Sequence, residues 1–326
     1  MGDPLPRTLG ALIRRSALAV ALTVAVSGLT ACEPVAEGGF SLLTYNVAGL
    51  PQEISPVTTG TNIPLISPKL EPYDVVVTQE DFDWWIPELD VLDFAEYHTR
   101  LRAQTTHPWA TGQHPGPAAV GIDGSDPERP MPLVGDGNGI LSRFPFDGAD
   151  RVPWEHCFGS ADTSDGGAAD CLAMKGFARA RLTLADGVEV DLYTVHAEAG
   201  RTAADTRMIA EDFDLLAGYI ATHSAGRAVI VAGDTNLHTR PGHVMEPVHA
   251  PIWTAFLADT GLVDVCVAVE CQDPGGIDKV AFRNGGGVTL AAHERRLETD
   301  VFVDSEGRAL SDHPPVSVEF TWTLWA

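Results

Sequence analysis

The chain has 326 residues, of which 44% are hydrophobic and 20% are charged, a composition typical of a globular protein with a sizeable core. The formal net charge of −24 excludes a generally basic nucleic-acid binder, because contacts to phosphate need clustered Lys and Arg. The 32 Gly and 23 Pro residues argue against a helical bundle or a coiled coil and favour many loops.

Residues 1–31 have the pattern of an export signal. An arginine-containing start precedes an uncharged apolar run over 17–29, which is too short to cross a membrane comfortably as a helix. The run ends in small residues followed by Cys32, and this resembles a bacterial lipobox. We predict cleavage before Cys32, lipidation of Cys32 and a membrane-anchored protein outside the cytoplasm. An ordinary signal peptide is the alternative, and the export route, Sec or twin-Arg, stays open.

The chain after the signal reads as one domain. Residues 32–39 are mostly small or polar and predict a short tether, and no later boundary is visible, so we predict a single domain over 40–326. Apolar periodicity predicts a long helix over 203–223 and a second over 251–260, and 107–138 reads as a long loop. Short runs rich in β-branched residues predict strands over 40–47, 74–78, 188–195, 228–232, 278–282, 299–303 and 315–320. We therefore expect a layered α/β protein with mostly antiparallel strands.

Four cysteines remain after Cys32, and three pairings of them are possible. The neighbours in sequence would form the disulfides Cys157–Cys171 and Cys266–Cys271, each closing a short loop, and an oxidising compartment would permit both. A zinc site is the alternative, but the spacings do not form paired Cys-x-x-Cys knuckles. The scattered histidines His238, His243 and His249 have spacings that fit no helix face, and we expect them in a surface loop.

Polar side chains recur where the predicted strands end, or just before the last strand begins. They are Asn46, Glu80, His196, Asp234 with Asn236, and Asp312 with His313. One such ending is weak evidence, but five suggest that a single rim collects metal ligands and proton-transfer groups. The carboxylate and amide oxygens suit Mg²⁺, Mn²⁺ or Ca²⁺. The two histidines can deprotonate a water or donate hydrogen bonds to a phosphoryl oxygen.

Four motifs in this order resemble the endonuclease/exonuclease/phosphatase superfamily, in its deoxyribonuclease I-like and sphingomyelinase C-like branches. They are Thr44-Tyr45-Asn46-Val47, Gln79-Glu80, Gly233-Asp234-Thr235-Asn236 and Ser311-Asp312-His313. Residues 138–145 and 175–177 also resemble the segments on either side of the family's central strand, so the resemblance spans about 40–320. It implies a four-layer α/β/β/α sandwich, with two sheets packed face to face and helices outside. It also implies a metal-dependent phosphoester hydrolase.

The resemblance further implies how the oxygen ligands divide their work. Asn46 and Glu80 would bind the main divalent cation, with Asp312 as a further oxygen ligand. Asp234 and Asn236 would orient the attacking water and the phosphate. The metal, expected to be Mg²⁺ with Mn²⁺ or Ca²⁺ as alternatives, and the number of ions stay open.

The histidines carry the remaining roles that the resemblance implies. His196 would contact a phosphoryl oxygen or assist the leaving group. His313, held by Asp312, would be the general base or a donor to the transition state. Weaker matches assign phosphate contacts to three further residues: Arg143, Asp278 and Lys279.

Charge guides the choice of substrate. A very acidic exported enzyme repels a polyanion at long range, and the segments 52–67 and 84–101 beside the site carry almost no Lys or Arg. We therefore expect a phosphodiester in a phospholipid headgroup or a small organic phosphate. An extracellular nuclease and an inositol-phosphate phosphatase are the alternatives within the family, and a catalytically dead binding module is the alternative class. No feature of the sequence indicates an oligomeric state.

Overall fold

We describe the protein from a computed structural model, in which residues 33–52, 55–82, 96–126, 128–157, 170–271 and 274–326 are placed. Glu33–Ala326 forms one structural unit. The predicted signal peptide, with Cys32, lies outside the described residues. Among the helices that the structure describes, none combines the length and the apolar character needed to cross a membrane.

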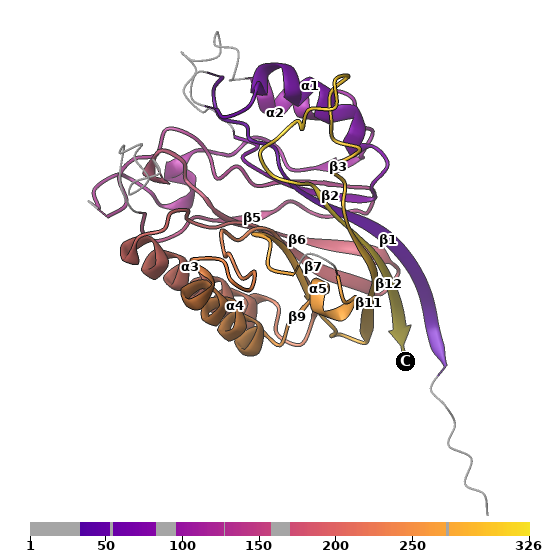
Figure 1. The fold of residues 1–326 in the computed structure, drawn as a ribbon. Helices are drawn as coiled ribbons and strands as arrows, with labels where there is room; N and C mark the ends of the chain where they lie inside the picture. Colours follow the sequence, from indigo (N-terminus) through magenta and orange to yellow (C-terminus); the bar gives the residue numbers. More distant parts are fainter. Residues whose placement is uncertain (1–32, 53–54, 83–95, 127, 158–169, 272–273) are drawn as a thin grey trace, which may run out of the picture. The chain divides into compact units, whose positions relative to one another are not determined.

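The first sheet has six strands in the order β11-β12-β1-β2-β4-β3 (Figure 1). Its strands are β1 (Pro34–Asn46), β2 (Val75–Gln79), β3 (Trp109–Ala110), β4 (Gly139–Ser142), β11 (Val288–Leu297) and β12 (Val316–Trp325). Strands β1 and β2 run parallel, and the other neighbours pair antiparallel.

The second sheet repeats this plan, in the order β5-β6-β7-β8-β10-β9. Its strands are β5 (Asp150–Val152), β6 (Gly176–Ala185), β7 (Val188–His196), β8 (Ala228–Asp234), β9 (Val263–Asp264) and β10 (Asp278–Arg283). Here β7 and β8 run parallel, and the other neighbours pair antiparallel. Both sheets are therefore mostly antiparallel, as the sequence predicts.

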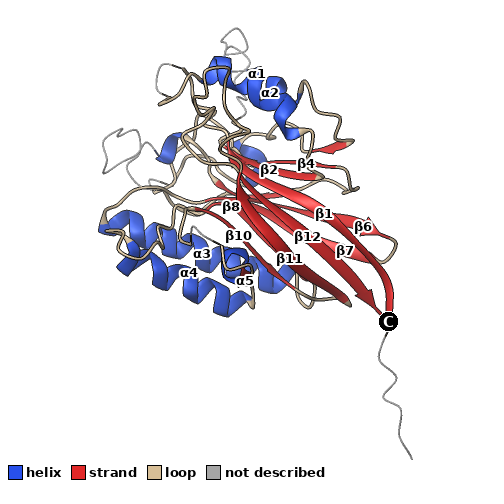
Figure 2. Cartoon of the chain, turned by 45° about the vertical axis from the view of Figure 1, so that its right-hand side comes forward, coloured by secondary structure: helices blue, strands red, loops and turns tan. Residues whose placement is uncertain are grey.

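The two sheets pack face to face around the main hydrophobic core (Figure 2). Side chains alternate along each strand, so Leu42 of β1 and Val77 of β2 meet Val190 and Leu192 of β7 between the sheets. All four are fully buried or nearly so.

Helices cover the outer face of each sheet. Helices α1 (Thr59–Leu70) and α2 (Tyr97–Arg102) pack on the first sheet, and α3 (Ala203–His223) and α4 (Glu246–Thr260) pack on the second. A short helix, α5 (Val265–Ala268), and two 3₁₀ turns, Pro117–Val120 and Asp170–Leu172, lie in the connections. The result is the expected four-layer α/β/β/α sandwich (Figure 1).

Both predicted disulfides, Cys157–Cys171 and Cys266–Cys271, are present. The tether prediction fails for residues 34–39, which continue β1 instead. They pair with the last residues of β12, and Gly38 lies directly under the ring of Trp322. The extended end of β12 therefore has a partner, and the strand is longer than the apolar pattern suggests.

The predicted strand over 299–303 is also wrong, because this segment is a turn. The backbone N–H groups of Val301 and Phe302 both donate to the carbonyl of Glu298. The apolar signal came from Phe302, which is buried and packs edge-on against Tyr45. A single anchoring side chain in a loop therefore resembled a strand.

Candidate active site

The topology brings four strand ends to one edge of the sandwich. Parallel strands end on the same side of a sheet, and the register pairs Asn46 of β1 with Gln79 of β2, and His196 of β7 with Asp234 of β8. Glu80 follows β2 directly. A hydrogen bond from Asn46 to Asp234 then links the edge of one sheet to the edge of the other. The rim predicted from the sequence therefore exists.

Two carboxylates meet at one amide in this rim. The Asn46 side-chain nitrogen donates to Glu80 Oε1 at 3.0 Å and to Asp234 Oδ2 at 3.1 Å. Asn46 is fully buried and its side-chain oxygen accepts from the backbone N–H of Ala48. Burial raises the pKa of Glu80, and the negative charges of Asp312 and Asp234 add to this effect. The pair is a concentrated, desolvated negative charge.

Glu80 is held by a network that the sequence analysis missed. Its backbone has a φ of 53°, in the left-handed region that non-glycine residues rarely adopt. The next residue, Asp81, is buried and accepts hydrogen bonds from Arg102, with His98 at 3.1 Å. Burial alone would raise the pKa of Asp81, but the Arg102 guanidinium and the contact with His98 hold it well below its usual range. This anchored neighbour fixes the backbone from which Glu80 projects.

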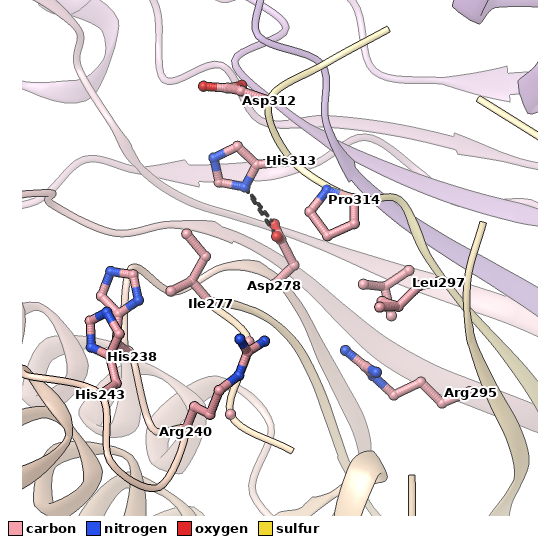
Figure 3. Close-up of a pocket in the computed structure, with 13 residues that line it drawn as sticks. His238, Arg240, His243, Ile277, Asp278, Arg295, Leu297, Asp312, His313 and Pro314 are labelled. Atoms are coloured by element: carbon pink, nitrogen blue, oxygen red, sulfur yellow. Dashed lines mark hydrogen bonds and ion pairs between the residues drawn. The ribbon is translucent and has the colours of Figure 1, made fainter. Parts of the chain in front are cut away.

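The partner of His313 is Asp278. The His313 Nδ1 atom lies 3.1 and 3.0 Å from the two carboxylate oxygens of Asp278, and its Nε2 lies 3.7 Å from Asp234 (Figure 3). Burial alone would lower the pKa of His313, but the charges of Asp234 and Asp278 outweigh it and raise the pKa to about 11. The ring is therefore an imidazolium at neutral pH.

The prediction that Asp312 holds His313 is wrong. Asp312 is exposed, and Figure 3 shows its side chain directed away from the contact between His313 and Asp278. Its carboxylate accepts from the hydroxyl of Ser311 at 3.4 Å. Asp312 and His313 lie in a bend before β12, where neighbouring side chains point to different sides, so sequence adjacency is a poor guide to contact. Its charge still reaches Glu80, whose pKa it raises, so Asp312 lies near the rim without holding His313.

His196 lies on the other side of Asp234, with its Nε2 3.9 Å from Asp234 Oδ2. The ring is 3% exposed, and its Nδ1 has no hydrogen-bond partner among the described residues. Burial, reinforced by the positive charge of Lys175, lowers its pKa to about 3. His196 is therefore neutral, whereas His313 is charged, so the two histidines differ in chemistry.

Asn236 and Lys175 complete the rim. The backbone N–H of Asn236 donates to Asp234 Oδ1 at 3.0 Å, and its side chain donates to the carbonyl of Ala197. Asn236 therefore steadies Asp234. Lys175 is buried, with its Nζ 3.6 Å from Glu198. The sequence analysis noted Lys175 only within a matching segment.

Two residues assigned to phosphate contacts lie elsewhere. The guanidinium of Arg143 contacts Glu71 and lies 3.6 Å from Asp74, which precedes β2, whereas Glu80 follows it. The length of that strand separates Arg143 from the rim. Lys279 follows Asp278 on β10, so its side chain points to the opposite face, toward Thr239 and the ring of Trp253. Both assignments are wrong.

The donor set at the rim fits a hard divalent cation. The half-buried Glu80 and the buried Asp234 present carboxylate oxygens around one buried amide, where a cation would offset their charge. A second group, Asp234, Asp278 and His313, has ligand atoms within 4.8 Å of one another. The ring of His313 already contacts Asp278, so this second group is better described as an ion-pair network.

A family model described as the endonuclease/exonuclease/phosphatase family matches residues 43–313, which is most of the chain. The chain belongs to the endonuclease/exonuclease/phosphatase family. The match starts within β1 and ends at His313, so it spans every strand end at the rim.

Two curated relatives of this family member are the sphingomyelinases of Mycobacterium bovis and Mycobacterium tuberculosis. Each is 31% identical over 304 residues, covering 87% of this chain and 53% of the relative. The chain thus spans about half the length of the curated relatives it matches.

Solved structures of the endonuclease/exonuclease/phosphatase fold share the architecture. Beta toxin from Staphylococcus aureus has a TM-score of 0.56 at 15% identity, and sphingomyelinase C from Streptomyces griseocarneus has 0.54 at 19%. Each alignment covers 86% of this chain and 99% of the other. A family protein from Beutenbergia cavernae has a TM-score of 0.58 at 18% identity, covering 88% and 72%. At these identities the likeness shows the fold.

Proposed function

We propose that this chain is a metal-dependent phosphodiesterase that cleaves the headgroup phosphate of phospholipids or small organic phosphates. One observation carries the proposal. At one edge of the sandwich, Asp234 shares the amide of Asn46 with Glu80 and also lies 3.7 Å from the charged ring of His313. A phosphodiester placed there would meet negative charge that binds a cation and positive charge that binds its oxygens.

We assign the cation to Glu80 and Asn46, with Mg²⁺ as the first candidate and Mn²⁺ or Ca²⁺ as alternatives. Asn46 would ligate through its side-chain oxygen, so its amide would have to turn over from the orientation in which its nitrogen donates to Glu80 and Asp234. When bound, the ion would offset the charge that develops on the phosphoryl oxygens. The similar structure of Staphylococcus aureus beta toxin has bound magnesium ions, which supports Mg²⁺ as the first candidate here. Asp312 stays a predicted further ligand: its carboxylate is exposed, and its charge acts on Glu80.

Asp234 would accept the proton of the attacking water. Burial raises its pKa, but the positive charge of His313 and the hydrogen bonds from Asn236 and Asn46 lower it overall, so it stays ionised. The bond from the Asn236 backbone fixes the Oδ1 atom of Asp234. A base that is held in place and kept ionised is suited to orienting a water for in-line attack.

His313 would donate to the phosphoryl oxygens or the leaving group. Its Nε2–H faces the rim, while Asp278 holds the other ring nitrogen and stabilises the positive charge. His196 would donate a neutral hydrogen bond from the other side of Asp234. A hydrogen bond from a charged donor strengthens as negative charge grows in the transition state. We therefore expect His313 to contribute more to catalysis than His196.

We place the enzyme outside the cytoplasm, anchored to a membrane through Cys32. Two disulfides support an oxidising compartment. The net charge of −24 disfavours a nucleic-acid substrate, and the sphingomyelinase relatives favour a lipid phosphoester. A nuclease is the first competing outcome.

The test is hydrolysis of bis-p-nitrophenyl phosphate with Mg²⁺ or with chelator. We expect chelator to abolish the activity and His313→Ala to reduce it about 100-fold. The control His223→Ala removes an exposed histidine at the end of α3 and should match the wild type. Equal rates in all samples would refute the proposal. Headgroup release from phospholipid and sphingomyelin vesicles, run beside plasmid nicking, separates the substrates, and nicking alone would favour the nuclease.

A further inference from the structure

A cavity of about 350 Å³ opens beside His313, between the loop after β8 and strand β11 (Figure 3). His313 and Asp278 form one wall. Arg240 and Arg295 lie on the side of the cavity away from His313. A substrate held at His313 would extend one of its two ester arms into this space. The residues that line the cavity therefore indicate the chemistry of that ester arm.

The two arginines reach the cavity from unrelated parts of the chain. Arg240 lies in the loop after β8, and Arg295 lies on β11, opposite Val318 of β12. The chain has 21 Lys and Arg against 45 Asp and Glu, so two guanidinium groups make this cavity locally positive in an acidic protein. Guanidinium groups bind phosphate through paired, charge-assisted hydrogen bonds.

The backbone around Arg240 is fixed before any ligand binds. A Cβ atom at Gly275 would collide with the backbone of Thr239 and Arg240, so only glycine permits this close approach. The N–H of Thr239 donates to the carbonyl of Gly275 at 3.2 Å. The Lys279 ammonium ties the same segments together by donating to Thr239 at 2.9 Å and to the carbonyl of Gly276 at 2.6 Å. Lys279 therefore builds the cavity, although it does not line it.

Arg295 is also positioned by its surroundings. Its guanidinium donates to the sulfur of Cys271 at 3.7 Å, and Cys271 is tied to Cys266 by a disulfide. The side chain is half-buried on a strand that pairs along its length with β12. Its positive charge lies close enough to Asp278 to oppose the rise in the pKa of that carboxyl group.

We propose that this cavity binds a second phosphate group, carried on the headgroup arm of the substrate and held by Arg240 and Arg295. The inference rests on the proposed phosphodiesterase activity and narrows its substrate. A quaternary ammonium arm such as choline needs aromatic faces, and imidazole rings are the only aromatic groups among the described lining residues. Two carboxylates also line the cavity, but Asp278 is paired with His313 and Asp312 is exposed.

The test is calorimetric binding, in chelator so that no turnover occurs, of three p-nitrophenyl phosphodiesters. Their second arms are phosphonoethyl, ethyl and trimethylammonioethyl. We expect the phosphonoethyl ester to bind about tenfold more tightly than the ethyl ester, as a charged hydrogen bond predicts. Arg240→Gln and Arg295→Gln should each remove this preference. Arg143→Gln deletes an arginine that lies away from the rim and should keep it.

Equal affinity for the three esters, or tighter binding of the trimethylammonioethyl ester, would overturn the inference whatever the enzymatic activity. Turnover of the same esters with Mg²⁺ tests the proposed function separately, because binding preference and hydrolysis can fail independently.

Sedimentation with phosphatidylcholine vesicles that contain or lack phosphatidylglycerol phosphate identifies the source of the second phosphate group. Preferential binding to the doped vesicles indicates a lipid headgroup, and tight binding of the soluble ester alone indicates a free phosphate compound.

Discussion

At the residue scale, His313 carries the positive charge of the site, because two carboxylates from neighbouring strands, Asp278 and Asp234, raise the pKa of its ring. The ring, Asp234 and the Asn46–Glu80 pair were all predictable, because polar groups ended apolar strands. The partner of the ring was not, because Asp278 is 35 residues earlier and on another strand, whereas Asp312 is adjacent. Only the three-dimensional pairing of β8 with β10, which sets Asp278 opposite Asp234, identifies the contact.

The first prediction separates these two aspartates. In Asp278→Asn we expect kcat/KM to fall about 100-fold, because the cationic form of His313 loses the carboxylate that stabilises it. The negative charge of Asp278 raises the pKa of His313, so its removal lowers that pKa. Activity that needs the protonated ring is then lost at a lower pH, and the alkaline limb of the pH profile should move down.

The matched control is Asp312→Asn, which removes the same charge from an exposed neighbour. We expect both its rate and its pH profile to stay close to those of the wild type. A larger loss in Asp312→Asn than in Asp278→Asn would restore the sequence-based assignment and contradict the geometry.

At the scale of elements, helix α3 was predicted with its correct ends, and helix α1 was not predicted. The apolar positions of α3 follow helical spacing, and its first turn is closed by a capping box between Thr202 and Asp205. Helix α1 contains Pro64 and Pro68, which disfavour a helix locally. Its buried side chains pack on the first sheet, and this tertiary contact stabilises a helix that its sequence opposes.

Strands β6 and β11 were missed for different reasons. Strand β6 has the alternating pattern, with Ala180 and Leu182 buried and Arg179 and Arg181 less buried, so closer attention to period two would have found it. Strand β11 is an edge strand with a charged, largely half-buried or exposed end, and it carries almost no periodic signal. Edge strands of this kind become visible only through their partner, here β12.

The capping box supplies the second prediction. Thr202→Ala removes the side-chain acceptor for the N–H of Asp205, and it should lower the free energy of unfolding by about 1 kcal/mol. Denaturant titration measures the change. Thr222→Ala, at an exposed position in the last turns of the same helix, is the control and should cost less. If the two variants lose equal stability, the cap does not contribute as described.

At the scale of the whole molecule, the sandwich joins two sheets with the same plan, each with one parallel pair among its described strands. The order of the motifs predicted this architecture through the family resemblance, not through hydrophobic pattern alone. What the sequence could not supply was the packing of one sheet edge on the other, which places Asn46 beside Asp234. The sequence also did not predict that Arg143 and Lys279 lie away from the site.

The disulfides supply the third prediction, which concerns overall stability. The Cys157–Cys171 bond closes a loop with a sequence separation of 14, and a chain-entropy model assigns such a loop about 3 kcal/mol. The double variant Cys157→Ser/Cys171→Ser should therefore lower the melting temperature more than Cys266→Ser/Cys271→Ser, whose separation is 5. The reverse order in a calorimetric scan would mean that native-state contacts, rather than loop length, decide.

The central claim is that strand ends from both sheets form one site for a divalent cation. The most direct measurement is titration calorimetry of Mg²⁺ into the wild type, Glu80→Gln and Asp312→Asn. We predict that Glu80→Gln weakens binding at least about tenfold, since a carboxylate ligand is lost, while Asp312→Asn, whose exposed charge acts on Glu80 through space, weakens binding less. Unchanged affinity in Glu80→Gln, or no binding of Mg²⁺, Mn²⁺ or Ca²⁺ to the wild type, would contradict the account.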